Sequence, residues 1–73
     1  MTLAELKVGD AARVLSLGGD EATERMMEMG LVEGTHFSVV RFAPLGDPIE
    51  IEMRGYHLSL RRAEAVSVEV ELL

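Results

Sequence analysis

Apolar and polar residues follow two different periods along this chain, and the helical period is confined to one short segment. In residues 21–29, three apolar positions recur with the spacing of one helix face: Ala22, Met26 and Met29. Asp20 precedes the segment as an N-cap residue, and Gly30 follows it where a left-handed C-cap falls. The pattern therefore predicts a short helix that buries this stripe and directs Met27 outward.

The outward face of the predicted helix carries three carboxylates: Glu21, Glu24 and Glu28. Glu21 stands four residues before Arg25, the spacing at which opposite charges on a helix attract each other. We therefore expect a solvated acidic face supported by this ion pair, with binding of a cation or a basic partner as the alternative.

The rest of the chain follows the two-residue period of β-strands. Five segments are predicted as strands, with turn residues between them: 11–17, 35–42, 49–53, 56–60 and 66–70. In the second of these, alternation separates two pairs of apolar residues onto opposite faces: Phe37 with Val39, and Val40 with Phe42. Single helical turns are predicted at residues 2–6, where Thr2 and Glu5 have capping-box spacing, and at residues 61–65. Strands this short favour a mainly β fold, a small barrel of about five strands with a short helical insert after the first strand.

The third and fourth predicted strands, residues 49–53 and 56–60, form a hairpin whose register can be checked by pairing. A two-residue turn at 54–55 places apolar residues opposite one another: Met53 with Tyr56, Ile51 with Leu58, and Ile49 with Leu60. On the wetter face the same register pairs polar residues: Glu52 with His57, and Glu50 with Ser59. All apolar residues of the hairpin, Tyr56 included, are therefore predicted on one buried face.

Length and composition indicate one small globular domain. The chain has 73 residues, of which 48% are hydrophobic and 27% charged, so residues 1–73 are expected to form a single domain with a thin core. Cysteine is absent, which removes disulfides and thiolate metal sites from consideration. No signal peptide opens the sequence, and no apolar run approaches the roughly 20 residues of a membrane span. We therefore expect a cytoplasmic protein without direct membrane insertion.

The charge balance narrows the class of partner. A formal net charge of −6 argues against nucleic acid and against anionic membrane surfaces, because both select basic faces. The classes of partner that remain are a small ligand, a cation and another protein. The sequence also lacks a glycine-rich phosphate loop, a nucleophile elbow and a cluster of metal ligands, so we do not expect an enzyme.

One central segment concentrates the rigid residues of the chain. The sequence FAPLGDPI, residues 42–49, contains both prolines, and Gly46 stands between them. The prolines fix two backbone angles and restrict the residues before them, so this loop is stiff. Two interpretations remain open: a barrel corner that directs Leu45 inward, or a preorganised loop that presents Leu45 to a partner.

Three blocks of the sequence together resemble one protein family. They are GLVEGT at residues 30–35, APLGDP at residues 43–48 and LSLRRAEA at residues 58–65, and the opening TLAELKVG adds to the resemblance. The family is FeoA, small cytoplasmic accessory proteins of bacterial ferrous-iron uptake. The resemblance implies an SH3-like β-barrel with a helical insert. It also implies a role beside FeoB, a membrane ferrous-iron transporter with a cytoplasmic GTP-binding domain.

The resemblance and the stiff loop together indicate where a partner would bind. The expected contact residues come from the end of the helix and from the loop: Met27, Gly30, Leu31, Ala43, Pro44, Leu45, Gly46, Asp47 and Pro48. Leu45 is the expected apolar anchor on the cytoplasmic region of the FeoB-like transporter. Docking there is expected to modulate transport or GTP hydrolysis, and association into a homo-oligomer is left open.

Two other functions are kept as alternatives. The first is a protein that binds or senses a divalent transition metal such as Fe(II). Glu52 and His57 are the best local pair for it, although two ligands make only a weak site. The second is an SH3-like adaptor for proline-rich peptides. Its groove is usually lined with aromatic side chains, and this chain offers only three: Phe37, Phe42 and Tyr56.

Overall fold

The computed structural model describes all 73 residues, and its elements follow one another in the order that the hydrophobic pattern predicts. A 3-10 turn at Leu3–Glu5 precedes five strands and two helices: β1 (Ala11–Leu17), α1 (Glu21–Glu28), β2 (His36–Phe42), β3 (Ile49–Met53), β4 (Tyr56–Leu60), α2 (Arg62–Ala65) and β5 (Val68–Leu72). In the predicted capping contact, the Thr2 backbone N–H donates to the Glu5 carboxylate over 2.8 Å. None of the helices has the length and apolar character that a membrane-spanning helix requires.

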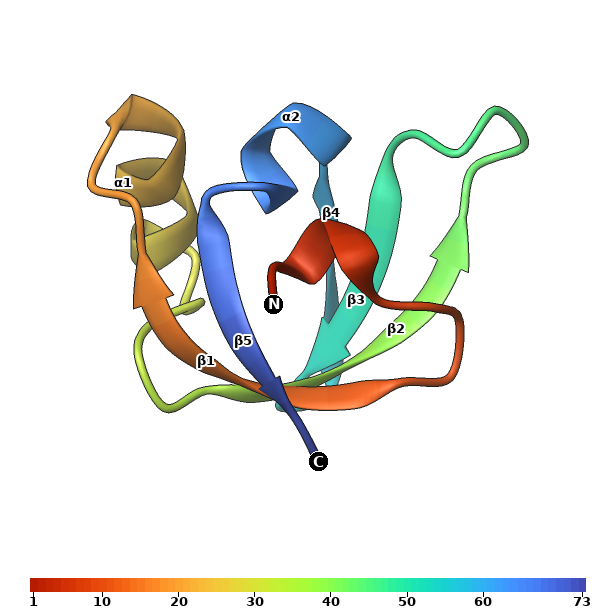
Figure 1. Cartoon of the computed structure of the whole chain (residues 1–73), viewed down its shortest axis with the longest axis horizontal. Coiled ribbons are helices and arrows are strands. Elements are labelled where there is room, and N and C mark those ends of the chain that lie inside the picture. The colour runs from red at the N-terminus through yellow and green to blue at the C-terminus, as the bar shows by residue number, and fades with distance from the viewer.

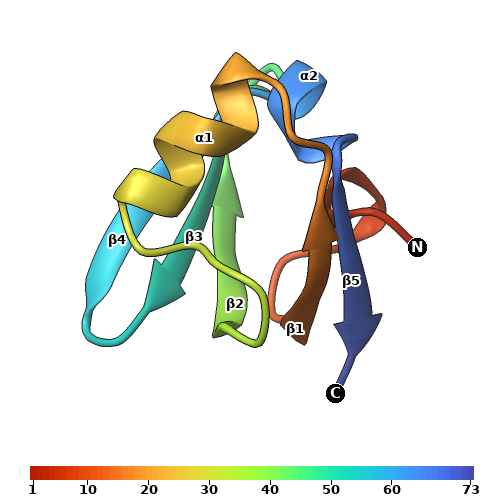
Figure 2. The same ribbon diagram turned by 90° about the vertical axis from the view of Figure 1, so that its left-hand side faces the viewer.

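The five strands form one strongly curved antiparallel sheet in the order β4-β3-β2-β1-β5. Figure 1 shows the sheet wrapping around an interior into which the N-terminal turn is set, with both helices toward the upper end. In Figure 2, α1 runs across the upper part of the sheet from β1 toward β4. Because β4 and β5 are the two ends of the sheet and do not pair with each other, the barrel is partly open, as predicted.

The β3–β4 hairpin has the predicted register. Ile51 pairs with Leu58 and Glu52 pairs with His57. The turn residues Arg54 and Gly55 have φ angles of 52° and 85°. Both values are positive, as a two-residue type I′ turn requires, so the turn and the alternation of the strands specify the same pairing.

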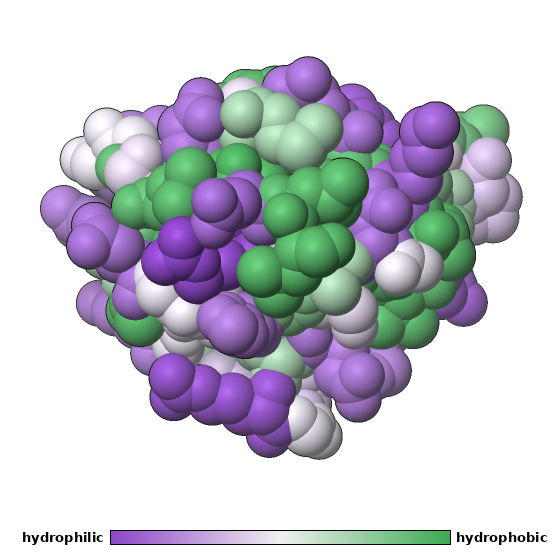
Figure 3. All heavy atoms as spheres, turned by 60° about the horizontal axis from the view of Figure 1, so that its bottom comes forward, coloured by the Kyte–Doolittle hydropathy of each residue, from purple (hydrophilic) through white to green (hydrophobic).

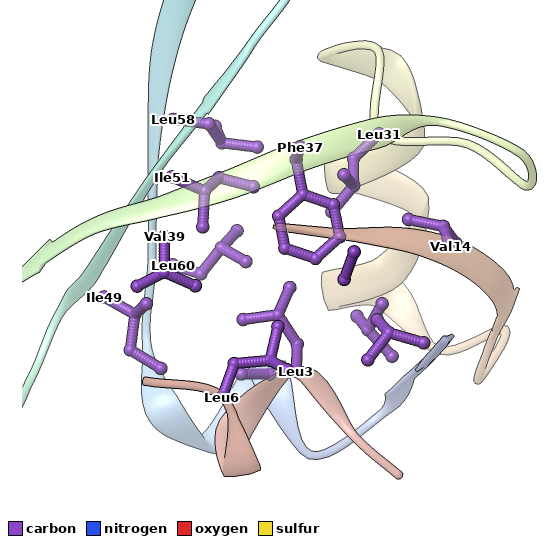
Figure 4. Close-up of a cluster of buried hydrophobic side chains, with 14 of the residues drawn as sticks. Leu3, Leu6, Val14, Leu31, Phe37, Val39, Ile49, Ile51, Leu58 and Leu60 are labelled. Carbon is purple, nitrogen blue, oxygen red and sulfur yellow. The ribbon is translucent and has the colours of Figure 1, made fainter. Parts of the chain in front are cut away.

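Sixteen buried hydrophobic residues, with members from every strand, form a single core. Figure 4 shows Leu3 and Leu6 pointing from the N-terminal segment into the space enclosed by the strands, on the same side as Ile49 and Leu60. Leu3 and Ile49 are both fully buried. Burying one such aliphatic side chain stabilises a fold by about 1.5–3 kcal/mol, so the N-terminal turn is part of the core of this barrel.

Strand β2 departs from simple alternation, and strand β5 begins later than predicted. The pairing of β2 with β3 shifts between Val39 and Arg41, and Phe42 thereby packs against the core. The prediction that Phe42 faces away from Phe37 was wrong, because a β-bulge adds one residue to the two-residue period. β5 begins at Val68 rather than at residue 66, because residues 66–67 belong to the turn after α2.

Helix α1 buries a different set of residues from the predicted stripe. Its N-terminus is capped as expected, since the Thr23 backbone N–H donates to the Asp20 carboxylate over 2.9 Å. Thr23 and Met26 are buried, whereas Ala22 is half-buried and Met29 is 45% exposed. Thr23 can be buried because its hydroxyl donates to the Asp20 carbonyl over 2.9 Å, which satisfies its polar group. Helix α1, which has only eight residues, therefore contacts the core through the one turn that contains Thr23 and Met26.

The predicted ion pair between Glu21 and Arg25 was also wrong. Arg25 instead pairs with Glu64 of α2, a residue 39 positions further along the chain. The arginine side chain is 61% exposed, so this pair contributes at most about 1 kcal/mol, but it does connect the two helices at the upper end of the barrel.

The cap at Asp20 makes α1 sensitive to acid. The hydrogen bond from the Thr23 backbone N–H is the largest cause that lowers the pKa of Asp20, and it outweighs the opposing effect of desolvation. A carboxylate with a lowered folded-state pKa adds stability above its unfolded pKa and loses it as the pH falls through the folded one. We therefore expect the free energy of unfolding to fall below about pH 4. Urea unfolding of the protein and of Asp20→Asn, which still caps a helix, should show a weaker acid dependence in the variant. Identical acid profiles would contradict this role for Asp20.

Candidate functional site

The loop between β2 and β3, residues 43–48, is closed by its own backbone, and we call it the proline loop. The Gly46 N–H donates to the Ala43 carbonyl over 2.7 Å, and the Ala43 N–H donates to the Pro48 carbonyl over 3.0 Å. Leu45 at the tip is 96% exposed. The interpretation in which Leu45 points inward is therefore wrong, and the loop holds an aliphatic side chain in solvent.

A single arginine of α2 anchors the proline loop to the rest of the barrel. Nη2 of Arg62 donates to the Gly46 carbonyl over 3.2 Å, and Nη1 donates to the Ala4 carbonyl over 2.8 Å. The backbone N–H of Arg62 donates to the Asp47 carboxylate over 2.9 Å. Its guanidinium carbon lies 5.5 Å from the centre of the Phe42 ring, a cation–π distance. One side chain thus connects the loop, the N-terminal turn and the end of β2.

The end of α1 does not join the proline loop in one surface. In Figure 1, α1 lies on the left and the proline loop extends at the upper right, and in Figure 2 the loop lies behind α1. Met27 is 39% exposed, whereas Leu31 is fully buried in the core. The predicted contact residues are therefore divided between two separate surfaces, and Leu31 is accessible on neither.

The end of α1 is fixed by a contact that sequence reasoning missed. The Tyr56 hydroxyl donates a hydrogen bond to the Met29 carbonyl, one of the groups that a helix leaves unpaired at its C-terminus. Gly30 follows with a φ of 101°, and the hydroxyl of Tyr56 occupies the place that a Cβ on Gly30 would take. Tyr56 lies on the predicted face of β4, in register with Met53, but it is 41% exposed, so the prediction that it is buried was wrong.

The predicted metal candidates, Glu52 and His57, lie in a charged row on the outer face of β3 and β4. His57 Nε2 is 3.9 Å from the Glu52 carboxylate, but Nδ1 is only 2.6 Å from the Glu50 carboxylate. Arg41 Nε approaches Glu50 to 3.5 Å from the other side. The nearer partner of His57 is thus Glu50. The structure contains no group of three or more His, Cys, Asp or Glu side chains arranged to hold a metal ion.

A hollow of about 450 Å³ opens at the lower end of the barrel, near the β3–β4 turn. Its lining combines apolar side chains, such as Phe37 and Met53, with charged ones, such as Glu52 and Arg54. Figure 3 shows this end of the molecule, where apolar and charged side chains are intermixed. The hollow is a depression open to solvent rather than the enclosed cavity that small-molecule sites usually form.

The three aromatic side chains do not line one groove. Phe37 is buried in the core, Phe42 lies under the guanidinium of Arg62, and Tyr56 lies at the end of α1. The adaptor alternative requires aromatic side chains side by side on the surface. This arrangement therefore favours a surface other than a proline-peptide groove.

The architecture defines an SH3-like β-barrel domain: one curved five-stranded antiparallel sheet with a short helix inserted after the first strand. A family model, the FeoA domain, matches residues 1–72. The chain belongs to the FeoA family, domains associated with ferrous-iron transport. This confirms the predicted family and fold.

Solved structures agree with this assignment. The NMR structure of the FeoA protein from Chlorobium tepidum is 49% identical, with a TM-score of 0.92 over all of this chain and 70% of that one. FeoA from Stenotrophomonas maltophilia, a crystal structure in complex with zinc, is 32% identical with a TM-score of 0.83, over 97% of this chain and 89% of that one. That protein is described as an SH3 domain protein that possibly acts as a ferrous iron transport activating factor.

A curated relative joins this domain to a transporter. The chain is 42% identical over 74 residues to the Fe(2+) transport protein A/Fe(2+) transporter FeoB fusion protein of Porphyromonas gingivalis. The alignment covers the whole of this chain, and it covers 9% of the length of the fusion protein. In that relative, the FeoA domain and FeoB are parts of one polypeptide, which supports an association between the two.

Proposed function

We propose that this domain is a non-catalytic accessory of ferrous-iron uptake that binds the cytoplasmic region of a FeoB-type transporter through its proline loop. Binding there would modulate transport or GTP hydrolysis. The fusion of FeoA and FeoB in the Porphyromonas gingivalis relative supports the choice of partner. The proposal includes a cytoplasmic location for the domain, because the region of the transporter that it would bind is cytoplasmic.

The exposure of Leu45 carries this proposal. A leucine that is 96% exposed gains about 1.5–3 kcal/mol when a partner buries it. The loop below it is held by Arg62 and by its own backbone, so little conformational entropy remains to be lost on binding. An apolar side chain on a preorganised loop has the properties of a binding hot spot.

Removing this side chain tests the proposal directly. Leu45→Ala is expected to bind the purified cytoplasmic domain of a FeoB-type transporter about 30-fold more weakly, because a hot-spot side chain contributes about 2 kcal/mol. The measurement is an amide NMR titration of the labelled protein, together with isothermal calorimetry. Leu15→Ala, which removes another exposed leucine from β1, is the matched control and should bind normally. The free energy of unfolding of both variants, measured in urea, should match that of the wild type within about 0.5 kcal/mol.

The same titration with Fe(II) alone separates docking from metal binding. Amide shifts at residues 43–49 with the transporter domain, and few shifts with iron, support the docking function. Shifts around Glu52 and His57 with iron, and none with the transporter domain, would instead favour the metal-binding alternative. Equal binding by Leu45→Ala and wild type would remove the proline loop from the interface.

The end of α1 is proposed as a second, separate contact. Met27 is 39% exposed and Gly30 is half-buried beside it, on the side of the molecule opposite the proline loop. A partner must therefore be large enough to reach both sides, or bind one side at a time. Shifts at Met27 in the titration above would support this contact, and their absence would limit the interface to the proline loop.

A further inference from the structure

Strand β4 ends the sheet, and the backbone polar groups of two of its five residues point away from β3. In a two-residue hairpin the residues that flank the turn, Met53 and Tyr56, exchange hydrogen bonds. Such pairs alternate along an antiparallel ladder, so Leu58 and Leu60 also bond to β3. The N–H and C=O groups of the two residues between them therefore point away from the sheet: those of His57 and Ser59.

The other end of the sheet is protected, whereas β4 is not. On β5, the Val70 N–H donates to the Met1 carbonyl over 2.9 Å, and Thr2 forms a bridge with Glu69. Proteins usually blunt an open edge with a proline, a lysine, a bulge or a covering segment. β4, with the sequence YHLSL, has no proline or lysine, pairs without a register shift, and lies at the outer edge of the sheet in Figure 2.

The two faces beside this edge have different chemistry. On the outer face, Glu52 of β3 has its side chain 50% exposed and stands opposite His57. On the inner face, the edge is flanked by Tyr56 and by Met29 at the end of α1, which are 41% and 45% exposed. A strand added beside β4 would thus lie next to His57 and near the Glu52 carboxylate on one face, and next to the apolar side chains of Tyr56 and Met29 on the other.

We propose that the edge of β4 binds an extended segment of another protein as a sixth strand, in which basic and apolar residues alternate. The backbone of the segment bonds to His57 and Ser59. Its apolar side chains pack beside Tyr56, and its lysine or arginine side chains reach across His57 toward Glu52. Neighbouring strands lie about 4.8 Å apart, so these long side chains can span the one intervening strand. The formal net charge of −6 favours such a basic segment over an acidic one.

A designed peptide tests this edge without the transporter. The probe is an acetylated and amidated peptide of alternating valine and lysine, seven residues long, and the control replaces each lysine with glutamate. The valine–lysine peptide is expected to slow hydrogen exchange of the His57 and Ser59 amides at least tenfold and to shift the amide signals of β4. The valine–glutamate peptide should do neither. Equal effects of the two peptides, or shifts confined to residues 43–48, would overturn the proposal.

Two variants assign the effect to the edge. Ser59→Pro removes an outward N–H without breaking the ladder to β3, because proline is tolerated on the solvent side of an edge strand. Ser59→Pro should lower the affinity for the valine–lysine peptide at least tenfold. Ser59→Ala, which keeps the N–H, should bind this peptide as the wild type does. If Ser59→Pro fails to fold, Glu52→Gln provides the second test: it should weaken binding about threefold and reduce its dependence on salt. Unchanged binding by every variant that folds would overturn the proposal, as would a dimer of the protein alone whose His57 and Ser59 amides are already protected.

Discussion

Replacing Gly30 by alanine is expected to lower the free energy of unfolding by about 2–3 kcal/mol, a large share of the stability of a domain this small. The backbone at residue 30 has a φ of 101°, where a side chain costs about 1–2 kcal/mol. The added Cβ would also overlap the Tyr56 hydroxyl, which must then leave the Met29 carbonyl. Losing that hydrogen bond costs about 1 kcal/mol more. Urea unfolding followed by circular dichroism measures the change as a lower midpoint at constant slope.

Two controls separate backbone strain from the lost contact. Gly34 has a φ of 89° with no atom within 4 Å of an added Cβ, so Gly34→Ala should show the strain alone, about 1–2 kcal/mol. Tyr56→Phe removes only the hydroxyl and should cost about 1 kcal/mol. In the double variant no hydroxyl is left to displace, so its loss should be about 1 kcal/mol smaller than the sum of the two single losses. Strictly additive losses, or equal costs at Gly30 and Gly34, would show that the contact does not stabilise the helix end.

The parts of the fold that the sequence predicts are those governed by near neighbours. The β3–β4 register follows from strict alternation on both sides of the turn at 54–55, and a slip of one residue would turn Ile51 and Leu58 toward solvent. The cap of α1 is equally local, because Asp20 needs only the backbone of Thr23. In such segments a single physical requirement decides the structure.

The incorrect predictions concern residues whose burial is determined by segments that are distant in the sequence. The bulge in β2 depends on how β3 pairs with it, so no period within residues 36–42 indicates that Phe42 returns to the core. Met29 fits the apolar stripe of a helix, but α1 meets the core through one turn only, and Met29 remains outside. Tyr56 completes the alternation of β4, yet the end of α1 holds it at the surface.

The candidate site shows the same division. Pro44 and Pro48 allow the stiffness of the proline loop to be predicted from the sequence. The structure adds that Leu45 faces solvent. The separation of this loop from the end of α1 could not be predicted, because it depends on the curvature of the whole sheet. Arg62 was missed for a related reason: its partners lie 15 to 58 residues away, so its spacing to them carries no pattern.

Replacing Arg62 by methionine is therefore expected to loosen the proline loop and to destabilise the domain by about 2–4 kcal/mol. The variant keeps a long side chain but loses two charge-assisted hydrogen bonds to the Ala4 and Gly46 carbonyls, each worth about 1.5–3 kcal/mol and not fully additive. The contact with the Phe42 ring adds about 0.5–1 kcal/mol. The backbone bond from residue 62 to Asp47 does not depend on the side chain, so part of the anchor should remain.

Arg61→Met is the matched control, because it removes an adjacent arginine whose side chain is 70% exposed. The one ion pair of this arginine is weak, since its nitrogen lies 4.0 Å from the Asp47 carboxylate. It should change the free energy of unfolding by less than about 0.5 kcal/mol, as exposed pairs contribute little. Amide relaxation of the two variants gives the second measurement. Amide order parameters at the non-proline residues of the loop, 43 and 45–47, should fall below about 0.6 in Arg62→Met and stay near 0.85 in Arg61→Met, since only the first loses the bonds that fix the loop. A loop that stays rigid in Arg62→Met would mean that the prolines and the loop's own backbone bonds suffice to hold it, and that the exposed position of Leu45 does not depend on α2.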